Sequence, residues 1–155
     1  VNTRMRKLSE GVAQATFLAC AGLNRLGMAE RITAPVPVDV MLPAVAQAVI
    51  GCEIRLDDQE TADFLAPLHH EETAHCVAAE RALLAALDGS CRTPIAALAE
   101  LTNGGIALRA QILREDGSEC LEARREGAVT EAAALGRDAG EELLGRAGPG
   151  FFASE

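Results

Sequence analysis

Long hydrophobic runs are absent from this sequence of 155 residues. No apolar stretch reaches the roughly 18 residues of a membrane-spanning helix, so we expect no membrane partner. The opening residues, VNTRMRKLSEG, have no initiator methionine and no apolar segment after their basic residues, which argues against a signal peptide. Because 49% of the residues are hydrophobic, the chain has enough apolar side chains to fold as an ordinary domain.

Closely spaced cysteine pairs are also absent. The chain has five cysteines, an odd number, and none of them forms a CxxC motif. This pattern argues against the disulfide framework of a small secreted protein and favours a reduced, cytoplasmic protein. The five positions are Cys20, Cys52, Cys76, Cys91 and Cys120.

Basic residues are few: the chain has 14 lysines and arginines against 23 aspartates and glutamates, and its one lysine is Lys7. The net charge of −9 argues against nucleic acid as a partner. Residues 1–31 differ from the rest, since they hold five basic residues against Glu10 and Glu30. Four of the five are arginines, which can bind carboxylates through two parallel hydrogen bonds. The first segment is therefore a candidate site for a small anionic ligand.

The first 68 residues predict an incomplete α/β arrangement. The TRMRKLSEG stretch predicts a short helix that ends at Gly11, and the apolar run ATFLACA, residues 15–21, predicts a buried strand. A short helix is expected over GLNRLGMAERI, and another over DDQETADFLAPL, ending at Pro67. One such strand cannot close a parallel sheet without neighbours. We therefore expect these residues to be part of a longer protein.

Residues 70–147 predict a complete α+β unit. A long helix is expected from about Glu71 to Leu87, closed by Asp88 and Gly89. Three antiparallel strands are then predicted over PIAALAEL, GIALRAQIL and CLEARREG, with turns at NGG and DG. A last helix runs from Thr130 to about Gly145. The predicted fold class is an α/β partial domain followed by a C-terminal α+β domain with a three-stranded antiparallel sheet.

Two local patterns contain residue types that bind metals or act as nucleophiles. HHEETAHC, residues 69–76, resembles a metal site, but His70 and His75 are five residues apart and do not share a helix face, so we predict no metal there. In the GSCRTP turn, Cys91 lies where the chain bends, although no second cysteine or catalytic histidine can be assigned to it. For Glu80, in the long helix, we expect an ion pair with Arg81, or else a role in holding the Cys91 loop.

Several longer stretches follow one another in a characteristic order: LSEG, AGLNRLG, MLPAVAQAVIG, LAPLHHEETAHCVAAERALLAALDGSCRTPIAALAEL and DGSECLEARREG. Their order resembles the hydroxymethylbilane synthases, also called porphobilinogen deaminases. The resemblance implies a three-domain protein with two α/β domains and a C-terminal α+β domain, of which this chain is the second half. Residues 1–43 would end domain two, residues 44–67 would return to domain one as a strand and a helix, and residues 68–155 would form the cofactor-attachment domain.

The resemblance also implies a function. Family members condense four porphobilinogens into a linear tetrapyrrole with release of ammonia, on a dipyrromethane cofactor joined to a loop cysteine by a thioether. The matching cysteine is Cys91, and Arg4 and Arg25 match carboxylate-binding arginines. Gln47 falls in the family's Val-Gly-Gln-Gly stretch. The catalytic aspartate is expected in the missing N-terminal domain, so no catalytic residue is assigned here and the chain alone should be inactive.

This sequence also departs from the family pattern. Alanines replace both glycines beside Gln47, and three residues differ around Cys91: Ser90, Arg92 and Thr93. A glycine-to-alanine change matters where the backbone has a positive φ. The alternative is therefore a diverged or truncated homologue that does not catalyse and acts as an interaction module.

Overall fold

The computed structural model describes residues 1–89 and 93–152 and divides the chain into two compact units, Val1–Met41 and Leu42–Glu155. The first unit contains helices α1 (Asn2–Ser9) and α2 (Cys20–Arg25) and the short 3-10 helix η1 (Ala29–Arg31). Of its described hydrophobic residues, Leu23 alone is buried. With so small a core, this unit leaves apolar side chains such as Phe17 and Val40 exposed to solvent.

The strand predicted over residues 15–21 is wrong. Residues 15–19 have no regular secondary structure, and Cys20 already begins α2. Phe17, which the apolar run places in a buried strand, is 67% exposed. A strand needs a neighbour to accept its backbone hydrogen bonds, and the described part of this unit contains no other strand.

The second unit begins with residues 42–58, which have little regular structure. Its one β contact there is an isolated antiparallel bridge between Ala44 and Ala96. Helix α3 (Gln59–Leu65) follows, with its N-terminus capped by the Asp58 carboxylate, which accepts a hydrogen bond from Thr61 N at 3.0 Å. The 3-10 helix η2 (Ala66–Leu68), which contains Pro67, ends this segment.

The rest of the second unit confirms the predicted α+β domain. Helix α4 (Glu71–Ala86) precedes strands β1 (Ile95–Thr102), β2 (Gly105–Leu113) and β3 (Cys120–Gly127), and the 3-10 helix η3 (Val129–Glu131) leads into α5 (Ala132–Ala147). The sheet is antiparallel with strand order β1-β2-β3. No helix in the described ranges is long and apolar enough to span a membrane.

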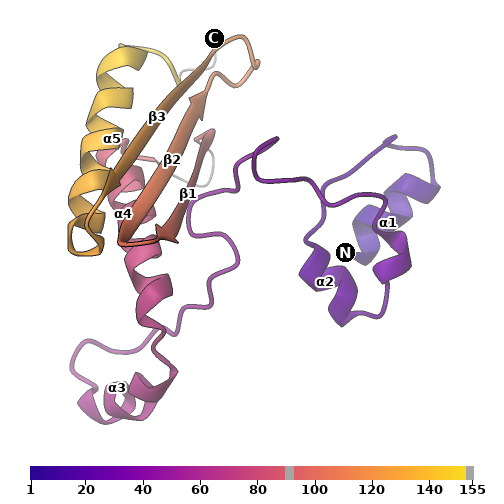
Figure 1. Cartoon of the computed structure of the whole chain (residues 1–155). Coiled ribbons are helices and arrows are strands. Elements are labelled where there is room, and N and C mark those ends of the chain that lie inside the picture. Colours follow the sequence, from indigo (N-terminus) through magenta and orange to yellow (C-terminus); the bar gives the residue numbers. More distant parts are fainter. Residues whose placement is uncertain (90–92, 153–155) are drawn as a thin grey trace. The chain divides into compact units, whose positions relative to one another are not determined.

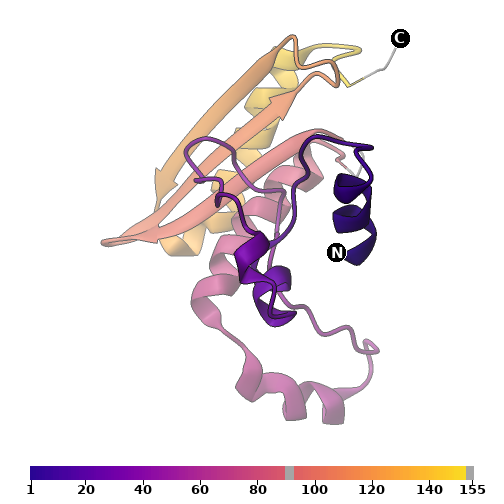
Figure 2. The same cartoon turned by 90° about the vertical axis from the view of Figure 1, so that its right-hand side faces the viewer.

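Helices α4 and α5 pack together on one face of this sheet (Figure 1, Figure 2). Side chains alternate along β2, so that Ile106, Leu108, Ala110 and Ile112 are buried beneath the helices while the residues between them lie on the opposite face. Leu83 of α4 and Leu143 of α5 are fully buried in the same core. The core also contains Leu87, which follows α4, and Ile95, which begins β1.

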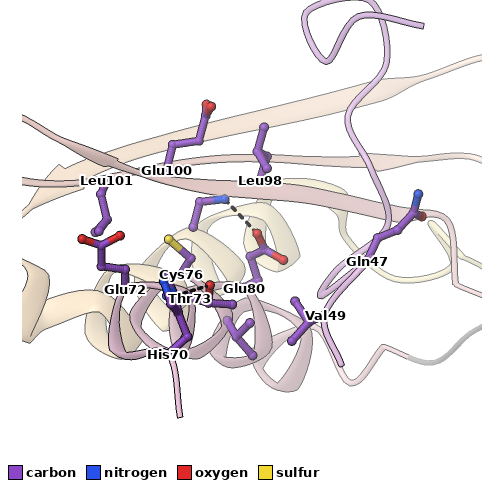
Figure 3. Close-up of a pocket in the computed structure, with 12 residues that line it drawn as sticks. Gln47, Val49, His70, Glu72, Thr73, Cys76, Glu80, Leu98, Glu100 and Leu101 are labelled. Carbon is purple, nitrogen blue, oxygen red and sulfur yellow. Dashed lines mark hydrogen bonds between the residues drawn. The ribbon is translucent and has the colours of Figure 1, made fainter. Parts of the chain in front are cut away.

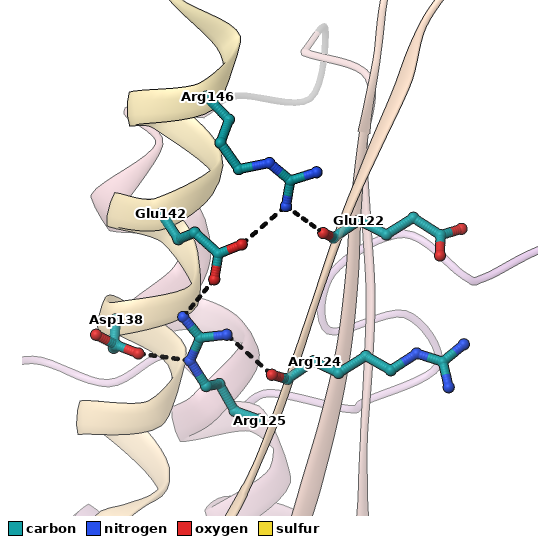
Figure 4. A network of polar contacts seen from close by, with 6 residues as sticks. All are labelled: Glu122, Arg124, Arg125, Asp138, Glu142 and Arg146. Atoms are coloured by element: carbon teal, nitrogen blue, oxygen red, sulfur yellow. Dashed lines mark hydrogen bonds and ion pairs between the residues drawn. The ribbon is translucent and has the colours of Figure 1, made fainter.

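A network of charged side chains joins β3 to α5 (Figure 4). Arg125 donates hydrogen bonds to Asp138 and to Glu142, the latter at 2.6 Å. Arg146 donates to the other Glu142 oxygen at 2.8 Å and to the backbone oxygen of Glu122 at 2.7 Å. Hydrogen bonds from Arg125 and Arg146 lower the pKa of Glu142, so its carboxylate stays charged and the network stays intact at neutral pH.

Candidate functional site

The two ends of the loop that contains Cys91 are held by different elements. At one end, α4 closes with Asp88 at φ 49°, where Asp88 N donates to Ala85 O and Gly89 N donates to Leu84 O. This pair of bonds is a Schellman motif, which satisfies the last helix carbonyls. At the other end, Pro94 O accepts from Leu113 N at 3.0 Å. Cys91 itself lies outside the described residues, so its predicted role stays a prediction.

Gly89 has a packing role at the start of this loop. A Cβ at this position would lie 2.5 Å from Ile95 Cδ1 and 2.7 Å from Leu84 Cδ1. Both distances are too short for carbon atoms. A larger residue at this position would therefore require the ends of the Ile95 and Leu84 side chains to move.

Arg4 and Arg25, the predicted carboxylate ligands, both lie in the first unit. Arg4 is exposed on α1, and its Nη1 donates to the backbone oxygen of Phe17 at 2.7 Å. Arg25 is the last residue of α2, is exposed, and has no ion pair with any residue in the described ranges. A guanidinium has five N–H donors, so both side chains retain donors for an added carboxylate.

Gln47 belongs to a tight turn in the second unit. Gln47 N donates to Ala44 O at 3.1 Å, which closes a four-residue turn. Ala46 has φ 55° and Ala48 has φ 67°, so both neighbours of Gln47 are in the left-handed region. Only glycine adopts this region at no steric cost. The resemblance noted above places glycines at these two positions.

Glu80 is the buried charged residue of the described core, with 6% of its surface exposed. The predicted ion pair with Arg81 is absent from the described contacts. Instead, Glu80 Oε1 accepts from Ala99 N at 2.9 Å and Oε2 accepts from Ala46 N at 2.7 Å. These partners lie 19 and 34 residues away. Sequence reasoning missed this role, because adjacent charges suggested a local pair.

A pocket of about 410 Å³ lies beside Glu80 (Figure 3). Gln47 lies at the end of this pocket opposite Glu72 and Leu101. Burial raises the pKa of the Cys76 thiol, and the nearby carboxylates of Glu80, Glu100 and Glu72 raise it further. Cys76 is therefore protonated at neutral pH and is a poor nucleophile, because the thiolate is the reactive form.

The histidine-rich stretch has a local structural role. His70 caps the N-terminus of α4, since its Nδ1 accepts from Thr73 N at 3.3 Å. His75 Nε2 lies 3.8 Å from Glu71 Oε1, one helical turn away. Within residues 1–89 and 93–152, the structure shows no group of three or more potential metal ligands.

These features define a protein with an exposed arginine-bearing unit and an α+β domain that holds a cysteine loop between a helix and an antiparallel sheet. Two family models match the chain in this order. Porphobilinogen deaminase, dipyromethane cofactor binding domain, matches residues 1–63. Porphobilinogen deaminase, C-terminal domain, matches residues 74–145. Together they cover most of the sequence, and the chain belongs to the porphobilinogen deaminase family.

Individual relatives agree with this assignment. The porphobilinogen deaminase of Paracoccus denitrificans (strain Pd 1222) is 55% identical over 152 residues, which cover 98% of this chain and 49% of the relative. The chloroplastic porphobilinogen deaminase of Pisum sativum is 53% identical over 157 residues, covering 99% of this chain and 42% of the relative. The chain thus spans about half or less of the length of these relatives.

Proposed function

We propose that this chain is the cofactor-attachment part of a hydroxymethylbilane synthase, which condenses four porphobilinogen units into the linear tetrapyrrole hydroxymethylbilane. Each joining of two units forms one carbon–carbon bond, breaks one carbon–nitrogen bond and releases ammonia, so no oxidant is needed. The observation that supports this proposal best is the match of both family models, in order, along one chain. The proposal concerns the protein at the full length of its relatives.

Cys91 is the proposed attachment point of the dipyrromethane cofactor. When bound, this group supplies the covalently held primer on which the tetrapyrrole is built. A cysteine thiolate in a loop is a suitable nucleophile toward an electrophilic pyrrole. Two of the other thiols are less suitable, because burial raises the pKa of Cys76 and of Cys120. The loop ends at Gly89 and Pro94 are anchored, which favours a defined site.

Arg25, Arg4 and Gln47 are the proposed partners of the cofactor and substrate carboxylates. Each pyrrole ring carries an acetate and a propionate, and burying these groups unpaired would be costly. The guanidinium of Arg25 fits this role, since it is exposed and has no ion pair in the described ranges. Arg4 keeps four of its donors after its bond to Phe17 O.

The chain alone is proposed to be inactive. By resemblance, the catalytic aspartate belongs to the part of the relatives that this chain does not span. Without that part, the catalytic aspartate would not lie beside a substrate bound by the carboxylate partners of this chain, and proximity contributes strongly to such reactions. We propose a reduced compartment such as the cytoplasm, in keeping with the widely spaced cysteines.

The test uses the complete gene product and measures porphobilinogen consumption together with intact mass and peptide mapping. We expect a dipyrromethane adduct on Cys91, loss of activity in Cys91→Ser, and little change in Cys120→Ser, the matched control. Mapping of the adduct to another cysteine would reject the attachment site. A complete protein with neither adduct nor consumption would instead favour the non-catalytic homologue.

A further inference from the structure

Glu80 connects two segments that are far apart in the sequence. Its carboxylate is buried between α4 and the open edge of β1 (Figure 3). One oxygen accepts the backbone N–H of Ala99 in β1, and the other accepts the backbone N–H of Ala46 in the turn before Gln47. One side chain therefore fixes the turn directly to the sheet of the cofactor-attachment domain.

The turn needs such an attachment because its backbone is strained. Two left-handed alanines flank Gln47, and in this region the Cβ of an L-residue lies too close to backbone oxygen. Strain of this kind persists only where the surroundings hold it. Pro43 O accepts from Ala97 N at 3.0 Å, and Val45 packs against the core. Glu80 adds the hydrogen bond at Ala46, the first left-handed residue.

We propose that Glu80 is a positioning residue for Gln47. It holds the Ala46 N–H, this bond keeps the left-handed turn formed, and the turn sets the direction in which Gln47 leaves the backbone. The inference rests on the proposed function, in which Gln47 contacts a pyrrole carboxylate. Glu80 thus contributes to substrate turnover through Gln47 without touching the substrate.

The first test is a double-mutant cycle in the complete protein, with Glu80→Gln and Gln47→Ala. The amide introduced by Glu80→Gln has one acceptor oxygen and turns an N–H₂ toward a second N–H, so one of the two contacts is lost. We expect kcat/KM for porphobilinogen to fall roughly 10- to 100-fold in Glu80→Gln. In the Gln47→Ala background, Glu80→Gln should lower kcat/KM by less than about threefold, because the side chain through which Glu80 acts is already absent. Additive losses would overturn the inference.

The second test separates positioning from general stability. In the 155-residue chain, amide hydrogen exchange should show a protected Ala46 N–H that exchanges at least about tenfold faster in Glu80→Gln. The Leu83 amide, within α4, is the internal control and should remain protected. Glu80→Asp keeps the charge but shortens the side chain, so it provides a milder variant should Glu80→Gln fail to fold.

The outcomes distinguish the two proposals. Unchanged exchange at Ala46 in both Glu80 variants would overturn the inference, whatever the activity. A complete wild-type protein that consumes no porphobilinogen would overturn the proposed function, and with it the role of Gln47 toward substrate. Active wild-type protein with a non-additive cycle and faster Ala46 exchange supports both.

Discussion

Gly136 lies where α5 crosses α4, and adding one methyl group there should destabilise the protein strongly. A Cβ at Gly136 would lie 2.0 Å from Ala79 O and 2.8 Å from the Ala79 carbonyl carbon. Both neighbours are backbone atoms, so no side-chain rotation relieves the overlap. Normal carbon contacts are about 3.5–4.0 Å, so the helices must separate by about 1 Å or more. Separation would loosen the packing around Leu83 and Leu143.

The expected magnitude follows from two opposing effects. Alanine is the better helix former by about 1 kcal/mol, which favours Gly136→Ala. Overpacking of a core costs about 1–3 kcal/mol and sometimes more, and here the overlap is with backbone. Because the overlap is with backbone, the overpacking cost should reach or exceed the upper end of this range, which leaves a net loss of about 2 kcal/mol or more from a typical free energy of unfolding of about 5–15 kcal/mol.

Gly145→Ala is the matched control, because it makes the same change in the same helix. A Cβ at Gly145 would meet no atom within 4 Å, so Gly145→Ala should stabilise the protein by about 0.5–1 kcal/mol. Gly140→Ala should be intermediate, since its Cβ would lie 2.7 Å from Ala86 Cβ and 2.9 Å from Leu83 O.

Urea denaturation followed by far-ultraviolet circular dichroism is the appropriate assay, since the chain has no tryptophan or tyrosine for fluorescence. The expected order of stability is Gly145→Ala, wild type, Gly140→Ala and Gly136→Ala, from highest to lowest. A Gly136→Ala variant as stable as Gly145→Ala would refute the close helix crossing.

Two further predictions concern the turn at Gln47 and the charged network. Ala46→Gly and Ala48→Gly should each raise the free energy of unfolding by up to about 1 kcal/mol, because glycine adopts a positive φ without steric strain. A lower urea midpoint in both variants would contradict the positive φ angles. The lowered pKa of Glu142 stabilises the fold above the pKa of the unfolded state, near 4.5, and this contribution is lost as pH falls through the lowered value. The stability difference between wild type and Glu142→Gln should therefore shrink as pH falls from about 6 to about 3, and a difference that does not change with pH would contradict the role of Arg125 and Arg146.

The C-terminal domain was predictable because its signals are local. The helix over Glu71–Ala86 is rich in helix formers and ends at an Asp-Gly pair, and in β2 the apolar residues that become buried alternate with positions that include Arg109 and Gln111. Short turns then leave few ways to pair the three strands. Sequence and structure therefore agree closely from α4 to α5.

The first unit was less predictable because its strand signal depends on a partner. A short apolar run is compatible with a buried strand, but it does not reveal whether a neighbouring strand is present. In the described part of the unit none is, and Phe17 is exposed. A run of apolar residues thus indicates a preference for burial, but tertiary contacts decide whether the run forms a strand.

The candidate site was predictable only in part. The resemblance to the family identified four site residues, and their roles remain predictions: Cys91, Arg4, Arg25 and Gln47. The contacts of Glu80 could not be read from the sequence, because they join backbone groups 19 and 34 residues away. For the left-handed turn, the one indication in the sequence was that the family has glycines on both sides of Gln47.

The contacts along β1 also bear on how the protein behaves at high concentration. An open strand edge exposes backbone groups that can pair with a strand of another molecule and start aggregation. On the outer edge of β1, the Ala97 N–H is used by Pro43 O and the Ala99 N–H by the Glu80 carboxylate. Because these two donors are already paired within the chain, this stretch of the edge is a poor template for strand addition from a second copy.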